Sequence, residues 1–544
     1  MTFRRLLGFL SPYRGQVIAS ALLAAGSQGA ALLIPYLTGV VIDAAQAGES
    51  RRRIYTYALL IVCAGALQGV LMFFRRWLAG RLSLGVEYDL RNRMYAHMQR
   101  LSYRFFDRHQ TGQLLSRATT DVQAVRVFLG YGLIFFFQHL FTITSVLVLL
   151  TLLNVQLTLV ALMITPVLAY LAFRYSRVSH PVLKEVQQRV ADVTAQAEEN
   201  VVGVRVVKAF AQEDAESERF RAGSERIFRQ ALRAAWLQTL YVPAMTALPG
   251  LALAGVMLVG GYQVVHHELT LGQFFAVNSY LLLLMLPLRA IGMWVGQYQR
   301  AMASGERVFE VLDEDRDIVE RADARPLPPG PGALRFEHVG FGYDDAHPVL
   351  SGIDLAIPSG QTVALIGPTG CGKTTLTTLI PRFYDVGRGR VLLDGMDVRD
   401  ATLDSLRSAI GIVGQDTFLF STTVAENIAY GVPAATPEQI VAAAQRAQAH
   451  DFIMDLPDGY DTMLGERGLT LSGGQRQRIA IARALLMDPR VLILDDATAS
   501  VDASTEARIK LALREVMQGR TTLIIAHRLS TISLATRVVV LDHG

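Results

Sequence analysis

Long apolar runs fill the first 300 positions of the chain, and shorter apolar runs separated by polar turns fill the rest. A helix needs about 20 mostly apolar residues to cross a lipid bilayer. Six stretches meet this requirement, at residues 17–41, 54–78, 127–151, 156–175, 236–262 and 271–296. The pattern therefore predicts an all-α transmembrane domain with six helices.

Two long polar stretches interrupt the apolar runs, at residues 79–126 and 176–235. The other links between predicted spans are short, so both polar stretches fall on the same side of the membrane. They are rich in charged residues and in good helix formers. We expect membrane helices that continue well beyond the bilayer, each pair turning at its tip.

A second domain follows a segment rich in proline and glycine, which ends with Arg325-Pro-Leu-Pro-Pro-Gly-Pro-Gly332 and has the composition of a linker. We predict a transmembrane domain at 1–312, a linker at 313–332 and an α/β domain at 333–544. Short β-like runs in this domain lie at Thr362–Ile366, Val491–Leu494 and Thr522–Ile525.

Charged residues make up only 18% of the chain, whereas a soluble protein carries roughly a quarter. The formal net charge of +4 does not indicate a nucleic-acid partner, because the arginines flank apolar segments and form no single patch. The two cysteines, Cys63 and Cys371, lie in different domains, so we expect neither a disulfide nor a cysteine metal site.

Three polar residues within the apolar runs, Gln138, His139 and Asn278, allow two interpretations. They can form hydrogen bonds between helices. They can equally line a substrate cavity, because polar groups in lipid are costly and tend to face an interior.

The strand Thr362–Ile366 leads into Gly-Pro-Thr-Gly-Cys-Gly-Lys-Thr and then a helix-like run. This order of strand, G-x-x-x-x-G-K-T loop and helix is typical of a phosphate-binding loop. Its backbone N–H groups close around phosphate oxygens, Lys373 reaches the β- and γ-phosphates, and the Thr374 hydroxyl binds Mg²⁺. The predicted ATP-binding residues of the loop are Gly367, Pro368, Thr369, Gly370, Cys371, Gly372, Lys373, Thr374 and Thr375.

A second strand, Val491–Leu494, ends in Asp495. Four apolar residues followed by a carboxylate form the Walker B pattern, in which the aspartate holds Mg²⁺ directly or through water. The pattern is weak alone, but it is good evidence downstream of a phosphate-binding loop.

Between these motifs lies Leu471-Ser-Gly-Gly-Gln475, about 20 residues before the Asp495 strand. This run resembles the signature of the ATP-binding cassette (ABC) family. In that family the loop caps the γ-phosphate of ATP held by the opposite cassette. The resemblance therefore implies a dimer and adds four ATP-binding residues, Ser472, Gly473, Gly474 and Gln475.

Further elements of the family match single residues. Tyr343 matches the aromatic residue that stacks on adenine, and Gln415 matches the glutamine that contacts Mg²⁺ and faces the membrane domain. Asp502, in Ser-Val-Asp, matches the loop that crosses to the other cassette. His527 matches the switch histidine near the γ-phosphate.

The membrane half resembles the exporter branch of the family. Phe105-Phe106-Asp107 looks like the first coupling region, and the stretch from Glu198 through Val206–Phe210 to Glu213 looks like the second. Gly465–Gly468 matches the loop that exporters place against the cytoplasmic helix tips.

The sequence departs from the family at Asp496, where most members carry the glutamate that polarises the attacking water. Aspartate is one methylene shorter, so its carboxylate retreats by roughly 1–1.5 Å. A misplacement of about 1 Å can cost about 10²-fold in rate. We predict that Asp496, Gln415 and His527 form a catalytic site that binds ATP but hydrolyses it slowly.

This departure bears on the partner, because each ATP lies between one chain's phosphate loop and the other chain's signature. A partner carrying the glutamate would form one competent site with this chain's intact signature, so we predict a heterodimer of two different half-transporters. A homodimer with adequate aspartate chemistry is the alternative.

The resemblance implies ATP-driven alternating access that moves a hydrophobic or amphipathic small molecule or a lipid. It also implies a multi-pass protein of the cell membrane, in contact with membrane lipid, with its cassette in the cytoplasm. An importer on the exporter fold and an ATP-gated channel or regulatory receptor are the alternatives. Because the family normally adds a strand and a helix after the last strand here, we expect the cassette to be truncated at Gly544.

Overall fold

A computed structural model describes residues 2–344, 347–465, 468, 470–495, 503–526 and 528–544. Contacts between Cα atoms divide the chain into two compact units. The helical unit comprises Met1–Tyr95 and Leu115–Leu312, and the α/β unit comprises Ala96–Leu114 and Asp313–Gly544. The α/β unit therefore includes a short segment that belongs, in sequence, to the long polar stretch at residues 79–126.

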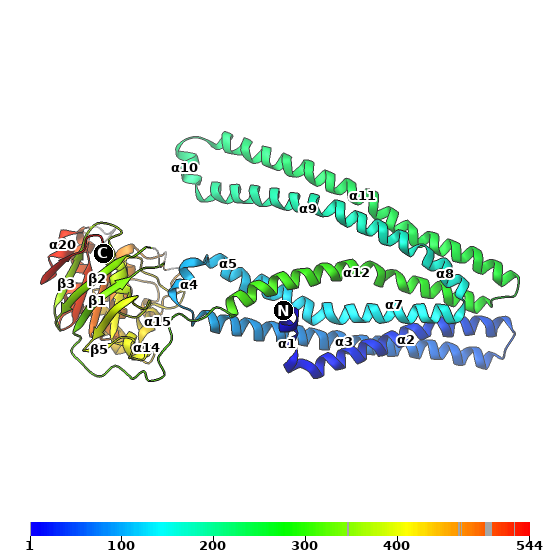
Figure 1. Ribbon diagram of the computed structural model, residues 1–544, viewed down its shortest axis with the longest axis horizontal. Coiled ribbons are helices and arrows are strands. Elements are labelled where there is room, and N and C mark those ends of the chain that lie inside the picture. Colours follow the sequence, from blue (N-terminus) through cyan, green and yellow to red (C-terminus); the bar gives the residue numbers. More distant parts are fainter. Residues whose placement is uncertain (1, 345–346, 466–467, 469, 496–502, 527) are drawn as a thin grey trace. The chain divides into compact units, whose positions relative to one another are not determined.

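The helical unit consists of long helices joined by short turns (Figure 1). Two of its elements, η2 and η3, are π-helices, and η1 is a 3₁₀-helix. The helices are α1 Thr2–Gly8, η1 Ser11–Tyr13, α2 Arg14–Gln46, α3 Arg51–Met98, η2 Arg117–Asp121, α6 Val122–Val127, η3 Phe128–Gly132, α7 Leu133–Leu153, α8 Val155–Met163, α9 Thr165–Val202, α10 Val204–Ala209, α11 Glu213–Val265 and α12 Leu271–Leu312.

Five helical stretches among the described residues are long and apolar enough to cross a membrane. They contain the first five predicted spans. The sixth predicted span lies in α12, where the apolar stretch found among the described residues is Leu271–Pro287. The five stretches are Ser11–Gln46, Arg51–Met98, Thr111–Leu153, Val155–Val202 and Glu213–Val265.

The fourth predicted span, at residues 156–175, is two helices instead of one. Asn154 caps the start of α8 by accepting a hydrogen bond from the Leu157 N–H at 3.0 Å. The helix then breaks at Ile164, and α9 begins with Pro166 in its first turn. Proline has no N–H to donate within a helix and fits best at such a start, which explains the break.

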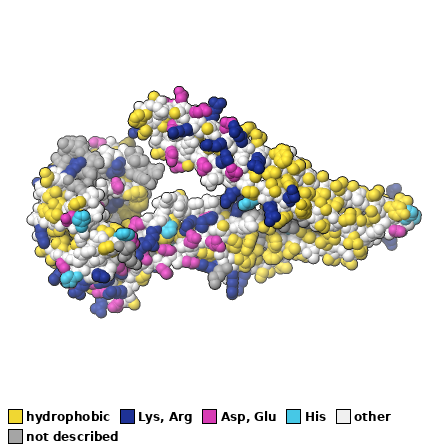
Figure 2. Space-filling view, turned by 45° about the horizontal axis from the view of Figure 1, so that its top comes forward, with side chains coloured by type: hydrophobic (Ala, Val, Ile, Leu, Met, Phe, Trp, Pro, Cys, Tyr) yellow, Lys and Arg dark blue, Asp and Glu magenta, His cyan; other side chains and the backbone are white. Residues whose placement is uncertain are grey.

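Large apolar side chains cover the outside of the membrane-spanning part. Leu59, Phe73 and Trp77 on α3, for example, are all more than half exposed. Figure 2 shows hydrophobic side chains over one half of the helical unit and charged side chains over the other half, including the α9–α10–α11 hairpin. Lipid is the solvent that such a continuous apolar surface requires.

The helix pair α9 and α11 continues past the apolar region and turns through α10 (Figure 1). We call residues 201–210 the α10 turn. Its apolar side chains point outward: Val202 is 81% exposed and Phe210 is 72% exposed. The predicted helical extension with a turn at its tip is therefore present.

The described part of the α/β unit contains two sheets. One has four antiparallel strands in the order β2-β1-β4-β5, and the other has five parallel strands in the order β6-β7-β8-β3-β9. The elements are α4 Tyr103–Arg108, α5 Thr111–Ser116, β1 Leu334–Phe341, β2 Leu350–Ile357, β3 Thr362–Ile366, α13 Lys373–Thr378, β4 Arg388–Leu393, β5 Met396–Asp397, α14 Leu403–Ser408, β6 Ile410–Val413, α15 Val424–Ile428, η4 Ala429–Gly431, α16 Pro437–Arg446, α17 His450–Met454, η5 Gly459–Asp461, α18 Gly473–Leu486, β7 Val491–Asp495, α19 Ala503–Met517, β8 Thr521–Ile525, α20 Leu529–Ile532 and β9 Arg537–Val540.

The parallel sheet is buried on both faces, as parallel sheets usually are. Its strands β3, β7 and β8 are almost entirely buried, and most of their residues are apolar. One apolar core packs α18 and α19 against one side of this sheet, and a second core joins its other side to the antiparallel sheet. The three β-like runs predicted from the sequence are these three strands.

Candidate functional site

The loop after β3 is the centre of the candidate site. Lys373, only 6% exposed, folds back so that its Nζ donates to the carbonyl oxygens of Gly367 and Pro368, both at 2.8 Å. A Cβ on Gly372 would lie 2.7 Å from Leu350 Cδ2, and the φ of Gly372 is +100°. Only glycine fits this backbone. The glycine allows the tight curl that brings the loop carbonyls to the Lys373 ammonium.

The hydroxyl groups after Lys373 face different surroundings. The Thr374 side chain is exposed at the start of α13, whereas Thr375 is buried. The Thr375 hydroxyl lies 3.1 Å from the hydroxyl of Tyr343, the predicted adenine-stacking residue. The Tyr343 ring meets Tyr384 edge-on at 5.3 Å, which fixes its orientation at the rim of the loop.

Parallel strands bring the other predicted Mg²⁺ ligands to the same sheet edge. Asp495 ends β7, and Gln415 follows β6 by two residues with its side chain exposed. Asp495 and Leu365 both lie opposite Ile525 of β8. Only one strand therefore separates β7 from β3, a spacing of about 10 Å.

Hydroxyl, carboxylate and amide oxygens are the ligands that Mg²⁺ prefers. The exposed Thr374 hydroxyl, Asp495 and Gln415 supply one of each at this edge. The residues thus fit the predicted ion, which would supply positive charge to polarise the phosphate oxygens.

The signature run begins α18. Ser472 Oγ accepts a hydrogen bond from the Gln475 N–H at 3.3 Å, and Gln475 Oε1 accepts one from the Ser472 N–H at 2.8 Å. This capping box fixes the start of a 14-residue helix. Ser472 and Gly473 remain exposed, so the positive end of the helix is open to an anion from outside the chain.

Four of the predicted residues, Asp496, Asp502, His527 and Glu466, lie outside the described residues. Their roles remain predictions from the sequence.

The comparisons with known proteins agree with this geometry. Residues 17–288 match the family model of the ABC transporter transmembrane region, and residues 350–499 match the ABC transporter model. The chain is 38% identical to an ATP-dependent lipid A-core flippase of Syntrophus aciditrophicus, over 100% of this chain and 90% of that protein. The chain belongs to the ABC transporter family.

This ABC transporter is also 40% identical to a multidrug efflux ATP-binding/permease protein of Mycobacterium tuberculosis, over 99% of this chain and 45% of that protein. Its structure resembles a solved bacterial Atm1-family ABC exporter with ATP bound, with a TM-score of 0.79 and 31% identity, over 98% of this chain and 94% of that chain. The predicted fold class, an all-α transmembrane domain with an α/β cassette, is confirmed, as is a multi-pass membrane protein with a cytoplasmic ATPase domain.

The first predicted coupling region of the transporter docks on its cassette. Tyr103 stacks on Phe383 with ring centroids 4.3 Å apart, and Ser102 donates a hydrogen bond to Asp317 at 2.9 Å. The Tyr384 hydroxyl donates to Asp107. Burial raises the pKa of Tyr384, and this hydrogen bond raises it further, so the phenol stays protonated.

Sequence reasoning identified Asp107 but missed the cassette side of this contact. Phe383 and Tyr384 follow α13, and Tyr384 also touches Tyr343 at the nucleotide site. The sequence contains a signal for this contact, because two adjacent aromatic residues follow Pro381-Arg382 shortly after the phosphate loop. Tyr384 therefore joins the docked turn to the rim of the nucleotide site.

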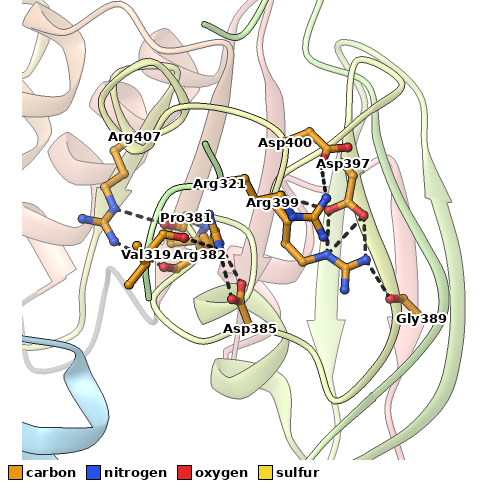
Figure 3. A network of polar contacts seen from close by, with 10 residues as sticks. All are labelled: Val319, Arg321, Pro381, Arg382, Asp385, Gly389, Asp397, Arg399, Asp400 and Arg407. Atoms are coloured by element: carbon orange, nitrogen blue, oxygen red, sulfur yellow. Dashed lines mark hydrogen bonds and ion pairs between the residues drawn. The ribbon is translucent and has the colours of Figure 1, made fainter. Parts of the chain in front are cut away.

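A network of arginines and carboxylates lies where the linker meets the cassette (Figure 3). Arg321 pairs with Asp400, and Arg382 donates to the Val319 carbonyl at 3.1 Å and to Asp385 at 2.7 Å. Arg407 donates to the Pro381 carbonyl at 3.2 Å. The contacts of Arg321 and of Val319 hold the linker against the cassette.

Asp397 and Arg399 form another part of the network (Figure 3), with 2.7 Å between Asp397 Oδ2 and Arg399 Nη2. Burial acts to raise the pKa of Asp397, but the hydrogen bonds from Arg399 and the arginine charges outweigh it and hold the pKa below its usual range.

Within the helical unit, a cavity of about 620 Å³ lies among α7, α8, α9, α11 and α12. Its walls are almost wholly apolar, with Ile143, Leu147, Leu281 and Met285 among them.

The three polar residues predicted either to join helices or to line a cavity are absent from these walls. Gln138 donates to Gln28 of α2 at 3.1 Å, and Asn278 donates to the Phe274 carbonyl of its own helix at 2.9 Å. His139 lies beside the rings of Phe135 and Trp294. The helix-joining interpretation therefore fits Gln138.

Proposed function

We propose that this chain is one half of a heterodimeric exporter whose own nucleotide site binds ATP and hydrolyses it slowly. ATP-driven transport follows from the family. The observation that carries the finer claim is Asp496, which stands where most family members have the catalytic glutamate. The intact signature at Ser472–Gln475 would serve the partner's ATP instead.

Each predicted residue of the nucleotide site has a role in this proposal. Lys373 would release the two loop carbonyls that it now holds and turn to the β- and γ-phosphates, and the loop N–H groups would surround the same phosphates. Thr374, Gln415 and Asp495 would hold Mg²⁺. Tyr343 would stack on adenine, and His527 and Asp502 would act at the interface with the partner cassette.

Two exposed surfaces support assembly with a second half-transporter. The N-terminal end of α18 is open, although its capping box already satisfies Ser472 and Gln475 within the chain. The α10 turn presents valines and Phe210 to solvent at the tip of the α9 and α11 helix pair (Figure 1). Burying these side chains against a partner cassette is the most direct way to remove this apolar surface from water.

The apolar cavity supports a hydrophobic or amphipathic cargo. Of its 21 lining residues, only Thr158, Thr165, Tyr175, Ser176 and Thr246 carry a hydroxyl group, and none carries a charge. Such a pocket accepts hydrocarbon and rejects a strongly hydrated solute. The names of the lipid A-core flippase and the multidrug efflux protein agree with a cargo of this class.

The test of the slow site is Asp496→Glu in a complex with the partner. The partner's catalytic glutamate is first changed to glutamine, so that turnover reports this chain's own site. We expect ATP turnover to rise at least about tenfold, because the longer side chain brings the carboxylate to the water. Asp451→Glu, at an exposed position, is the matched control and should change nothing.

A gain below about twofold would show that the shorter side chain is not what limits this site. Substrate flux measured in inside-out vesicles tests direction at the same time. Uptake that depends on ATP supports export, whereas ATP-dependent loss would indicate an importer, and no coupled flux would indicate a gated channel.

A further inference from the structure

The predicted membrane spans contain arginines but no acidic residues. The six predicted spans include Arg75, Arg76, Arg174 and Arg289, but they contain neither aspartate nor glutamate. A charged group inside a membrane is costly and normally pairs with another charge or faces water. Each of these arginines therefore needs an anion from outside the spans, or water.

Among the arginines of the spans whose side chains the structure describes, Arg75 is the buried one. It lies on α3 with 3% of its surface exposed, whereas the next residue, Arg76, is exposed. Just beyond Arg75, α3 packs closely on the segment before α7: a Cβ on Gly130 would lie 2.3 Å from Ser83 Cβ. Arg75 is thus buried where α3 faces α7 and does not extend to the surface as Arg76 does.

Among the described residues, the Arg75 guanidinium has an aromatic neighbour, and its Nε has no acceptor. Its Cζ lies 4.7 Å from the centre of the Phe135 ring on α7. Its Nε is fully buried and, among the described residues, has no hydrogen-bond partner. A cation–π contact offsets only part of the cost of burying the charge, and it leaves the N–H donors unused.

A second buried donor lies against the same ring. Trp294 of α12 is stacked on Phe135, with centroids 5.5 Å apart and planes at 10°. Its indole Nε1 is buried and also lacks a partner among the described residues. The His139 ring lies 6.2 Å from Phe135 and 6.3 Å from Trp294. Two unpaired donors and an imidazole from three helices thus converge on one aromatic ring.

We propose that Arg75, Trp294 and His139 bind the anionic group, a phosphate or a carboxylate, of an amphipathic molecule. Guanidinium and indole N–H groups both donate, and a buried arginine is well suited to an oxyanion. Phe135, His139 and Trp294 are only partly buried, so the cluster opens to the surface of the helical unit.

The position of the cluster suits a molecule with an apolar tail. Ile143, which lines the apolar cavity, follows His139 by four residues on α7, about 6 Å along the helix. Leu281 and Met285, on the helix that carries Trp294, line the same cavity. This inference rests on the proposed amphipathic cargo and adds that its head group is negatively charged.

The test uses two probes that share an oleoyl chain and a glycerol unit. Lysophosphatidic acid carries a phosphate, and monoolein carries none. The full chain is placed in phosphatidylcholine nanodiscs with Trp77→Phe and Trp236→Phe, so that emission reports Trp294. We expect lysophosphatidic acid to change this emission saturably and monoolein to leave it unchanged.

Arg75→Gln should weaken the apparent affinity for lysophosphatidic acid at least tenfold, and Arg75→Lys should weaken it less. Arg76→Gln is the matched control on the same helix and should stay within twofold of the parent. Equal affinity in the parent and Arg75→Gln, or equal responses to both probes, would overturn the proposal. If Arg75→Gln fails to fold, the comparison of the two probes in the parent protein still tests whether the site binds an anionic group.

A second arm distinguishes a cargo from a resident acidic lipid. Labelled lysophosphatidic acid is followed in proteoliposomes with ATP and with the partner chain. Flux that Arg75→Gln abolishes identifies a cargo, and binding without flux identifies a lipid site; both outcomes retain the anion site. Failure of ATP-driven transport would contradict the proposed function and leave the nanodisc binding result intact.

Discussion

The two cytoplasmic turns of the helical extensions end in different surroundings. The turn that contains α4, Tyr103–Arg108, is here called the α4 turn. It docks on the cassette of its own chain, where Tyr103 stacks on Phe383 and Asp107 accepts a hydrogen bond from Tyr384. The α10 turn leaves Val202 and Phe210 almost fully exposed. Both were predicted from sequence motifs to be coupling regions. We propose that the α4 turn transmits movement within the chain and that the α10 turn binds a surface that another chain supplies.

The largest expected effect tests the exposed turn. Phe210→Asp should weaken assembly with the partner half-transporter by roughly thirtyfold, because a buried aromatic residue at an interface is worth about 2 kcal/mol or more. ATP binding to the chain alone should be unchanged, since Phe210 is 72% exposed there. Analytical ultracentrifugation of the two chains in detergent measures the change.

Phe228→Asp is the control for that variant, because Phe228 is also exposed but lies on α11 away from the turn. If both variants assemble as well as the wild type, the α10 turn is not the surface that the partner covers.

The docked turn gives a smaller effect. Tyr103→Ala removes the stacking on Phe383 and should reduce ATP-driven transport about tenfold, a typical size for the coupling between two sites. ATP binding at the loop after β3 should persist, because Lys373 and Thr374 are unaffected. Flux and nucleotide binding are measured on the same proteoliposomes.

Tyr95→Ala, at an exposed position on α3, is the matched control and should transport normally. Normal transport by Tyr103→Ala would mean that the docked turn does not carry the coupling.

The smallest effect concerns pH and the charge network that holds the linker. The folded-state pKa of Asp397 lies below its unfolded value. Its pairing with Arg399 therefore contributes its full stabilisation above about pH 4, and this stabilisation is lost as the pH falls through the folded-state pKa. Asp397→Asn should therefore be less stable than the wild type by under about 1 kcal/mol near neutral pH. The difference should shrink below about pH 4.

Unfolding by denaturant at several pH values measures this difference. Asp404→Asn, at an exposed position in the first turn of α14, serves as the control. A stability difference for Asp397→Asn that stays constant down to pH 3 would exclude the ion pair as its cause.

The sequence predicted the cassette better than the membrane part, for physical reasons. The glycines of the loop Gly367–Thr374 determine its backbone conformation. The apolar run before Asp495 identifies the strand that this residue ends. Such local patterns specify local structure directly. The helix break at Ile164 was readable in the same way, from Pro166, but the apolar run concealed it.

The remaining features depend on residues that are distant in the sequence. The contact of Tyr103 with Phe383, and that of Arg75 with Phe135, require the packing of separate elements. Apolar spans have no periodic polar face that would show which side of a helix lies inside. For that reason the sequence could identify Gln138, His139 and Asn278 as unusual without showing which neighbours they contact.

The most direct test of the central claim is ATP hydrolysis by this chain purified alone in lipid nanodiscs, with nucleotide binding and oligomeric state measured on the same sample. We predict that the chain binds ATP and shows negligible turnover, because its own site has Asp496 in place of a glutamate. Robust turnover by a homodimer would show that Asp496 is an adequate base and would contradict the heterodimer.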